Sequence, residues 1–224
     1  MKRVVTPELL DDDLGTSEEI RESLLDLRGL NENFGGFKSI AASLTTVAQM
    51  TQSRSLAFLD VGGGTGEVAE QVRRDLSLEE VHVEATILDR AISHMRGQQL
   101  NRVAGDALAL PFPSGSFDVV GCNLFLHHLE PEEMIKFFNE ALRVARLAVI
   151  ASDLRRNLFH WALAYAGRFT YRSRITRNDA PASVRRAYTI GEIREIAEQT
   201  SAASSQIKLH FFQRFGLILW KAQP

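Results

Sequence analysis

Apolar residues recur along the middle of the chain in short continuous runs, and stretches with helical spacing separate these runs. Continuous apolar runs of this length are typical of strands buried on both faces of a sheet. The predicted strands are residues 56–61, 84–89, 117–123 and 147–152. The predicted helices are residues 67–76, 91–100 and 131–146. This alternation predicts a parallel sheet with helices on both faces, whose ligands bind beyond the carboxyl ends of the strands.

The two ends of the chain have a different pattern. Residues 1–51 carry apolar residues at helical spacing on either side of a glycine pair, which predicts two or more helices around a hinge. Residues 153–224 start with a cationic, aromatic segment and finish with two strand-like runs that turn about residues 213–216, as an antiparallel hairpin would. We expect one domain, residues 1–224, with a helical cap in residues 1–51, a ligand-binding core in residues 52–152, and a lid insertion and final strands in residues 153–224.

The composition narrows the class of protein. A chain of 224 residues with 45% hydrophobic content is long enough for one good core, and a net charge of −2 gives no reason to expect a nucleic-acid binder. The single cysteine, Cys122, excludes an internal disulfide and fits a reducing compartment. The acidic start of the chain is unlike a secretory signal, and the apolar stretch after Leu158 is far shorter than the roughly 20 residues of a membrane span. We therefore expect a cytoplasmic protein.

A glycine-rich turn joins the first predicted strand to the first predicted helix of the core. Glycine is required where φ is positive or where a ligand touches the backbone, and N–H groups at a helix start attract an anionic or polar ligand. The turn is not the G-x-G-x-x-G of a dinucleotide fold, because Val68 falls where the last glycine would be. It also lacks the Gly-Lys-Ser/Thr of a phosphate-binding loop. The glycines of the turn are Gly62, Gly63, Gly64 and Gly66.

The run D-V-G-G-G-T-G, from Asp60 to Gly66, closely resembles the first motif of class I S-adenosylmethionine-dependent methyltransferases. This resemblance implies a Rossmann-like α/β fold, with a seven-stranded, mostly parallel sheet, helices on both faces and a C-terminal antiparallel hairpin. It also implies S-adenosylmethionine as cofactor and S-adenosylhomocysteine as product. Asp60 and the four glycines would then bind the cofactor.

Three later positions match the same family. Asp89 ends the second strand, is followed by Arg90, and resembles the acid that accepts hydrogen bonds from both ribose hydroxyls. Asp106 resembles the residue at the adenine amino group, with the Ala107 N–H available to a ring nitrogen. Asn123, at the end of the fourth strand, would lie near the methionine portion. Taken singly, Asp89 is also typical of a helix cap and Asp106 of a turn, but the order of these features favours a cofactor site.

Methyl transfer requires mainly that the acceptor is positioned and that water is excluded. A hydroxyl or phenol acceptor is helped by a base within hydrogen-bond reach, whereas at an electron-rich carbon a base matters only after transfer. The candidate catalytic residues are His127, His128 and Asp153, which follow the fourth and fifth strands. The alternative is that the imidazoles only pack at a helix entry and that Asp153 is a cap. The other histidines show no metal-ligand spacing, so we expect no metal.

In this family the N-terminal helices and the insertion after the fifth strand hold the acceptor. Both zones are aromatic here, which favours a lipophilic small molecule such as a phenol, a quinone precursor or a polyketide. The stretches RVVTPELLDDD and TRNDAPASVRRAYT resemble bacterial methyltransferases of quinone biosynthesis or polyketide clusters, and this resemblance implies the same kind of acceptor. The expected acceptor-binding residues are Phe34, Phe37, Arg156, Trp161 and Tyr165.

Residues 155–186 carry eight arginines against one acid, Asp179, with aromatic residues between them. This mixture suits an acceptor pocket with a guanidinium for an anionic group, or peripheral contact with an anionic membrane or a carrier protein. It equally suits ion pairs with the acidic N-terminal zone. The acids of that zone are Asp11, Asp12, Asp13, Glu18, Glu19 and Glu22.

Two other classes of protein share parts of the pattern. A nicotinamide-dependent oxidoreductase shares the sheet and the acid after the second strand, but it requires the missing third glycine and a catalytic pair such as Tyr-x-x-x-Lys, which the chain lacks. A non-catalytic binding module with a methyltransferase-like fold would show decayed cofactor residues, and here these residues are intact. The sequence therefore favours a methyltransferase.

Overall fold

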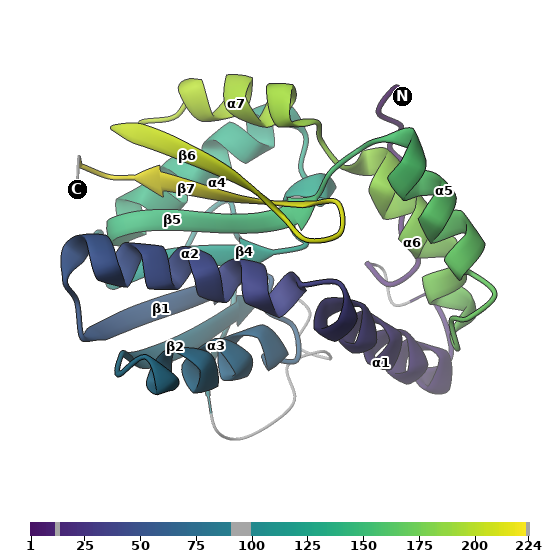
Figure 1. Ribbon diagram of the computed structural model, residues 1–224, viewed down its shortest axis with the longest axis horizontal. Helices are drawn as coiled ribbons and strands as arrows, with labels where there is room; N and C mark the ends of the chain where they lie inside the picture. Colours follow the sequence, from purple (N-terminus) through teal and green to yellow (C-terminus); the bar gives the residue numbers. More distant parts are fainter. Residues whose placement is uncertain (12–13, 91–99, 223–224) are drawn as a thin grey trace.

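The computed structural model describes residues 1–11, 14–90 and 100–222, and a seven-stranded sheet forms its centre (Figure 1). The strand order is β3-β2-β1-β4-β5-β7-β6, in which β7 runs antiparallel to β5 and β6 and the other neighbours are parallel. The expected mostly parallel α/β sheet with a C-terminal antiparallel pair is confirmed. The strands are β1 (Ser55–Val61), β2 (His82–Asp89), β3 (Asn101–Ala104), β4 (Phe117–Asn123), β5 (Ala145–Leu154), β6 (Ser204–His210) and β7 (Arg214–Trp220).

Helices cover both faces of the sheet and one of its ends (Figure 1). α2 and α3 pack on one face, α4 and α7 pack on the other, and α1, α5 and α6 lie together beyond the carboxyl ends of the parallel strands. No helix in the described part of the chain is both long and apolar enough to cross a bilayer. The helices are α1 (Ser17–Asn33), α2 (Gly36–Thr51), α3 (Glu67–Leu78), the short 3-10 helix η2 (Leu126–His128), α4 (Pro131–Val144), α5 (Leu158–Gly167), α6 (Arg174–Arg186) and α7 (Ile190–Glu198).

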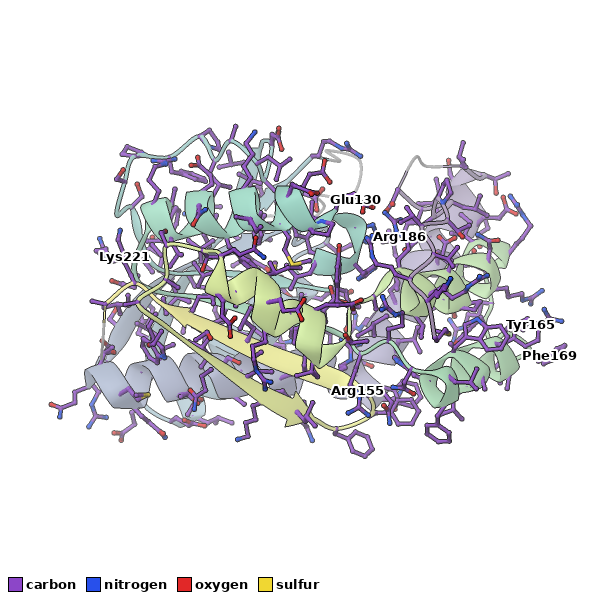
Figure 2. The ribbon with its side chains drawn as sticks, turned by 90° about the horizontal axis from the view of Figure 1, so that it is seen from above. Glu130, Arg155, Tyr165, Phe169, Arg186 and Lys221 are labelled. Carbon is purple, nitrogen blue, oxygen red and sulfur yellow. The ribbon has the colours of Figure 1, made fainter. Side chains whose placement is uncertain are left out.

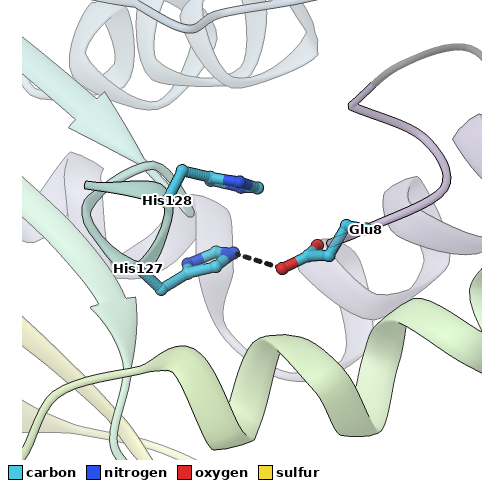
Figure 3. A group of neighbouring side chains, drawn as sticks. All are labelled: Glu8, His127 and His128. Carbon is cyan, nitrogen blue, oxygen red and sulfur yellow. Dashed lines mark ion pairs between the residues drawn. The ribbon is translucent and has the colours of Figure 1, made fainter. Parts of the chain in front are cut away.

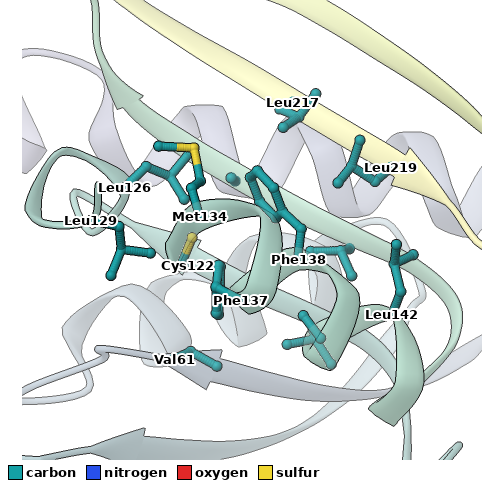
Figure 4. Packing of buried hydrophobic residues seen from close by; sticks show 14 of the residues in the cluster. Val61, Cys122, Leu126, Leu129, Met134, Phe137, Phe138, Leu142, Leu217 and Leu219 are labelled. Carbon is teal, nitrogen blue, oxygen red and sulfur yellow. The ribbon is translucent and has the colours of Figure 1, made fainter. Parts of the chain in front are cut away.

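Two hydrophobic clusters follow from the alternation of side chains along each strand. In β1, Leu56 and Phe58 join the cluster under α2 and α3, whereas Leu59 and Val61 join the cluster under α4 and α7. Figure 4 shows the second cluster, in which Phe138 of α4 lies near the leucines of β7. Because both faces are covered, the strands read as continuous apolar runs in the sequence.

The N-terminal zone is divided between two roles. Gly35, with a φ of +76°, lets the chain leave α1 and enter α2, as the glycine hinge predicted. Ile40, Leu44 and Val47 of α2 are fully buried against the sheet, so this helix belongs to the packed core rather than to a cap. Within this zone, α1 and the described residues before it lie at the carboxyl ends of the parallel strands.

Two expected boundaries change in the structure, and one expected helix cannot be compared with it. The hairpin turns at residues 211–213 rather than 213–216, because Arg214 already pairs with Leu154 and His210. α4 ends at Val144, since Ala145 begins β5. The predicted helix at residues 91–100 falls almost wholly on residues 91–99, which lie outside the described residues.

Candidate active site

A cavity of about 460 Å³ lies where the parallel strands end. The glycine turn and the ends of β1, β2 and β4 line one part of it. The other part is lined by α1, α5, α6, the hairpin turn and residues 8–11 of the N-terminal segment. One continuous space therefore joins the expected cofactor site to the aromatic zones expected to hold the acceptor.

The glycine turn is held by the neighbouring strand. The N–H groups of Gly62 and Gly63 donate to the Leu88 carbonyl, and the N–H of Gly64 donates to the Asp89 carboxylate at 2.8 Å. Gly66 has a φ of +85° and precedes α3, and a Cβ there would lie 2.4 Å from the Ile87 side chain. At Gly64 a Cβ would approach only Asp89, at 3.9 Å, so a side chain at this position would enter the cavity.

Two buried acceptor atoms face this part of the cavity without a hydrogen-bond partner among the described residues. They are Oδ2 of Asp60 and Oδ1 of Asn123, whose residues are 1% and 9% exposed. Burial, with the charge of Asp89, raises the pKa of Asp60 to about 7. Orphaned acceptors beside a carboxylate fit a ligand that brings hydrogen-bond donors and positive charge, as an amino-acid ammonium group does.

Three expected cofactor residues do not line the cavity as described. The Gly105 N–H donates to the Asp89 carbonyl at 3.1 Å, which places the end of β3 beside that of β2. The Asp106 carboxylate accepts from the Leu108 N–H at 2.9 Å, so it stabilises a turn. Asp106, Ala107 and the exposed Arg90 are not among the lining residues, and Arg90 adjoins the undescribed residues 91–99. Their adenine-side roles stay predictions.

His127 and Asp153 form a buried pair beside the cavity. The His127 backbone N–H donates to Oδ2 of Asp153 at 3.1 Å, and its Nδ1 lies 2.8 Å from Oδ1. Burial lowers the pKa of His127, but the charge and hydrogen bond of Asp153 and the charge of Glu8 outweigh this and raise it above its ordinary value. Burial opposes ionisation of Asp153, and His127 overcomes it, so the pKa of Asp153 is lowered. The two residues come from η2 and β5, and the structure brings them together as a hydrogen-bonded acid and base.

The other imidazole nitrogen of His127 faces the start of the chain (Figure 3). Its Nε2 lies 3.6 Å from Oε1 of Glu8, and His128 Nδ1 lies 3.0 Å from Asp11. Glu8, His127 and His128 are close enough together to hold a metal ion. However, the Arg186 guanidinium lies 3.4 Å from Glu8, and its positive charge disfavours a metal cation there.

Residues 1–11, which we call the N-terminal strap, cover the acceptor part of the cavity. The N–H groups of Leu9 and Leu10 donate to the two carboxylate oxygens of Asp179, at 2.9 and 3.0 Å. Arg3 pairs with Glu130 at 2.7 Å, which ties the start of the strap to the residue before α4. The strap therefore has a fixed path across α6 and η2.

The structure divides the expected acceptor residues. Phe34 and Phe37 line the cavity. Arg156 does not line the cavity, because its guanidinium donates hydrogen bonds to the Glu192 carboxylate at 2.6 Å and to the carbonyl oxygens of Met1 and Ala187. The predictions for Trp161 and Tyr165 are likewise corrected: these rings stack on each other at 5.4 Å and neither residue is among those lining the cavity, and Tyr165 is exposed (Figure 2). On helix α5 they occupy the outer face.

Several lining residues were missed by the sequence analysis. They include Glu8, Asn31, Phe212 and Arg214. Only Arg214 had a signal, since it is a lone charge at the start of the apolar run RFGLILW. The others come from segments whose positions depend on tertiary packing.

The charge runs of the two ends of the chain do meet. Arg174 pairs with Glu19 at 2.9 Å, and Arg186 lies 3.4 Å from Glu8 and 3.3 Å from Asp11. The interpretation of the basic segment as a partner of the acidic zone is thus confirmed for these two arginines. Asp12 and Asp13 of that zone lie outside the described residues.

The fold and the cavity define an α/β protein with a cofactor-type glycine turn, and comparisons with known proteins agree. Residues 59–148 match the family described as "Methyltransferase domain". The ubiquinone/menaquinone biosynthesis C-methyltransferase UbiE of Roseobacter denitrificans is 34% identical over 101 residues, which cover 40% of this chain and 38% of that protein. The UbiE of Cereibacter sphaeroides is 31% identical over 121 residues, which cover 47% and 46%. The chain thus spans less than half the length of these curated relatives.

Solved structures match over nearly the whole chain. The plantazolicin methyltransferase BpumL, in complex with S-adenosylhomocysteine, superposes with a TM-score of 0.72 at 13% identity, over 96% of this chain and 94% of that one. A SAM-dependent methyltransferase from Aquifex aeolicus gives 0.62 at 15% identity, over 91% and 98%. Residues 59–148 thus match a methyltransferase domain, and the chain has the fold of these S-adenosylmethionine-dependent methyltransferases, as its motifs predicted.

Proposed function

We propose that this protein binds S-adenosylmethionine and transfers its methyl group to a lipophilic small molecule. The observation that carries the proposal is the single cavity that joins the glycine turn to the His127–Asp153 pair. A donor at one end and an acceptor beside a base at the other would meet within it, shielded from water by α1, α5, α6 and the strap.

The cofactor end is built from backbone and carboxylates. The cofactor, when bound, supplies the electrophilic methyl group. The glycine turn gives it a surface free of side chains, and Asp89 would accept hydrogen bonds from its ribose. Asp60 and Asn123 have the orphaned acceptors for its ammonium group, and a cation there would lower the pKa of Asp60 again.

The acceptor end has walls suited to an apolar molecule. The side chains that form these walls are Leu24, Leu27, Leu30, Phe34, Phe37, Leu163 and Phe212. Such walls favour a phenol, a quinone precursor or a polyketide over a metabolite without an apolar body. The partial similarity to C-methyltransferases named for quinone biosynthesis supports the same class of acceptor.

His127 has the geometry of a general base for an acceptor hydroxyl. Asp153 holds Nδ1, which leaves Nε2 on the side of the cavity to take a proton. The Asp153 carboxylate then stabilises the imidazolium without itself becoming protonated. Glu8, 3.6 Å from Nε2, adds a second negative charge beside that cation.

Thermal unfolding with added ligands tests the cofactor assignment. At a hundredfold excess over its Kd, a ligand that binds only the native state adds about 2.7 kcal/mol, or roughly 5 to 11 °C in melting temperature for a domain of this size. S-adenosylhomocysteine and S-adenosylmethionine should produce this shift, and NADH and NADPH should not. A shift with a nicotinamide alone would instead indicate an oxidoreductase, and ligand-free protein that responds to none would indicate a binding module.

Transfer of a labelled methyl group tests the acceptor class. We expect labelled product with alkylphenols, and a KM that falls as the alkyl chain grows, because longer chains bury more apolar surface in the cavity. Sugars and amino alcohols of equal size serve as polar comparison compounds. Transfer only to the polar compounds would contradict the lipophilic assignment while leaving the methyltransferase assignment intact.

A further inference from the structure

Arg214 is a buried cation at the junction of the two ends of the cavity. It begins β7, is 3% exposed and lines the cavity. Its Nη2 donates to Oδ1 of Asn31 at 3.2 Å, while Nη1 is buried and has no hydrogen-bond partner in the described part of the chain. A buried guanidinium with an unpaired N–H donor costs free energy unless a ligand accepts a hydrogen bond from that donor.

A second buried arginine near the cavity shows what a guanidinium with carboxylate partners looks like. Nε of Arg186 also has no hydrogen-bond partner in the described part of the chain, but the rest of its guanidinium donates to the carboxylates of Glu8 and Asp11 and to the carbonyl of His128. Within the described ranges Arg214 has no carboxylate at ion-pair distance, and the acid that influences it, Asp153, is hydrogen-bonded to His127. Burial lowers the pKa of Arg214 to about 10, so it is still a cation at neutral pH.

The neighbours of Arg214 orient it without forming an ion pair with it. Oδ1 of Asn31 also accepts from the Asn123 amide at 3.4 Å, which fixes α1, β4 and β7 to one another at this point. The pKa of His160 is lowered, first by burial and then by the charges of Arg214 and Arg155, which favours the neutral imidazole. The corner thus has donors, one permanent positive charge and no bound anion from the described chain.

We propose that Arg214, positioned by Asn31, is the carboxylate subsite of this cavity. A carboxylate there would accept from Nη1 and neutralise the guanidinium, which is the pairing that a planar fork of N–H donors favours. Two ligands have this chemistry: the amino-acid portion of the cofactor, and an acceptor that carries a carboxylate of its own. The inference rests on the proposed function.

Calorimetric titration of two matched ligands tests the cofactor source. S-adenosylhomocysteine and its decarboxylated analogue differ only in the carboxylate. If the cofactor supplies it, the unmodified protein prefers S-adenosylhomocysteine by about 10- to 100-fold, the range for a charge-assisted hydrogen bond. Arg214→Gln then binds the two ligands alike, and Arg214→Lys recovers part of the preference. Circular dichroism and thermal unfolding show whether each variant is folded.

Titration with 1-naphthoate, with and without S-adenosylhomocysteine, tests the acceptor source. If the acceptor supplies the carboxylate, Arg214→Gln leaves S-adenosylhomocysteine affinity unchanged but loses naphthoate binding, while neutral 1-naphthol binds both proteins alike. The proposal is overturned if folded Arg214→Gln keeps both the preference for S-adenosylhomocysteine and the affinity for naphthoate. Failure of the unmodified protein to bind S-adenosylhomocysteine would contradict the proposed function instead, and the naphthoate arm without cofactor would still decide about Arg214.

A second inference comes from the outer face of α5. Its exposed apolar side chains lie on one side of the helix and the following turn: Leu158, Phe159, Tyr165 and Phe169 are 66%, 63%, 42% and 79% exposed. Figure 2 shows Tyr165 and Phe169 pointing away from the body of the molecule. Exposed aromatic residues in such a row mark an interaction surface.

Cations border this apolar row. The Arg168 guanidinium lies 4.1 Å from the ring centre of Tyr165 and 5.0 Å from that of Phe169. Arg168, Phe169, Arg174 and Arg177 line a shallow surface hollow beside it. We infer that this face lies on an anionic membrane, with the rings among the lipid headgroups and the arginines at the phosphates. A lipophilic acceptor would then be taken from the same membrane.

Co-sedimentation with vesicles tests this surface. We expect binding to phosphatidylcholine vesicles that contain one-third phosphatidylglycerol, and much weaker binding to phosphatidylcholine alone. Arg168→Gln and Arg177→Gln should each reduce binding roughly fivefold, in proportion to the charge removed, and Phe169→Ser should reduce binding to the anionic vesicles as well. Arg54→Gln, on a distant exposed ion pair, is the control. Equal binding to both vesicles, or binding to neither, would overturn the inference, the latter favouring a carrier protein as partner.

Discussion

The two ends of the cavity are formed by different parts of the chain, mostly by backbone groups at one end and mostly by side chains at the other. The cofactor end is mostly backbone at the carboxyl ends of adjacent strands, and its neighbours hold it rigidly, as the bonds from Gly62, Gly63 and Gly64 to β2 show. The acceptor end is mostly side chains from the strap, α1, α5, α6 and the hairpin turn. Changes at the cofactor end should therefore be all-or-none, whereas changes at the acceptor end should be graded and specific to the acceptor.

The largest effect is expected at Gly64. A Gly64→Leu side chain would project into the cavity rather than into the protein, so S-adenosylhomocysteine binding should be lost. The positive φ of +48° adds a folding cost of about 1–2 kcal/mol. Calorimetric titration measures the affinity, and thermal unfolding separates the two effects. Gly115→Leu, at a φ of +69° and outside the cavity, has a comparable backbone cost and should bind normally. Equal loss in both variants would show that strain, not occupation of the site, is responsible.

The next largest effect is expected at His127. If it removes a proton from an acceptor hydroxyl, His127→Ala should reduce kcat by roughly 10²- to 10⁴-fold, while S-adenosylhomocysteine still binds. The pKa of His127 is raised, so the base is protonated at a pH where an ordinary histidine is not, and activity should increase as the pH rises past 6.5 through this higher pKa. Rate measurements from pH 6 to 10 check this. Asp153→Asn should move the midpoint to lower pH, because it removes the charge that raises it.

An unchanged midpoint in Asp153→Asn would indicate that some other group limits the rate. An undiminished kcat in His127→Ala would indicate transfer to a carbon atom that needs no base before the methyl group moves. Either result would concern the acceptor end alone and would leave the assignment of the rigid cofactor end unchanged.

The sequence predicted the two ends unequally, for a physical reason. Asp60, the glycines and Asp89 follow directly from strands, and the ends of parallel strands meet at one edge of a sheet whatever covers it. Glu8 and Asn31 reach the cavity only because the strap and α1 pack against α6 and β7, which no local pattern encodes. Trp161 was expected at the acceptor because it is aromatic. The direction of its side chain depends on its position around the axis of α5, and this position lies on the outer face of the helix.

Asp179 shows how tertiary contacts define the acceptor end. It was the one acid in a basic segment, and its carboxylate holds the backbone N–H groups of Leu9 and Leu10. Asp179→Ala should lower the free energy of unfolding by about 1.5–3 kcal/mol, since two bonds to a charged group are lost. It should also increase hydrogen exchange in residues 1–11 and raise the acceptor KM, with cofactor affinity unchanged. Glu18→Ala, on an exposed pair with Arg21, should leave exchange in the strap unchanged. If cofactor affinity fell as well, the two ends would be coupled.

The smallest effect is expected from two residues of the same helix. Leu163 lines the cavity and Trp161 does not, although both lie on α5 and are partly buried. Leu163→Ala removes apolar contact with the acceptor and should raise its KM about fivefold, which corresponds to about 1 kcal/mol, the low end of the range for a side chain in an apolar pocket. Trp161→Ala removes a larger side chain but should change the KM less than twofold when the acceptor is presented in solution. Steady-state kinetics with one alkylphenol compares them directly, and the reverse order of effects would mean that the acceptor binds along the outer face of α5 and not in the cavity.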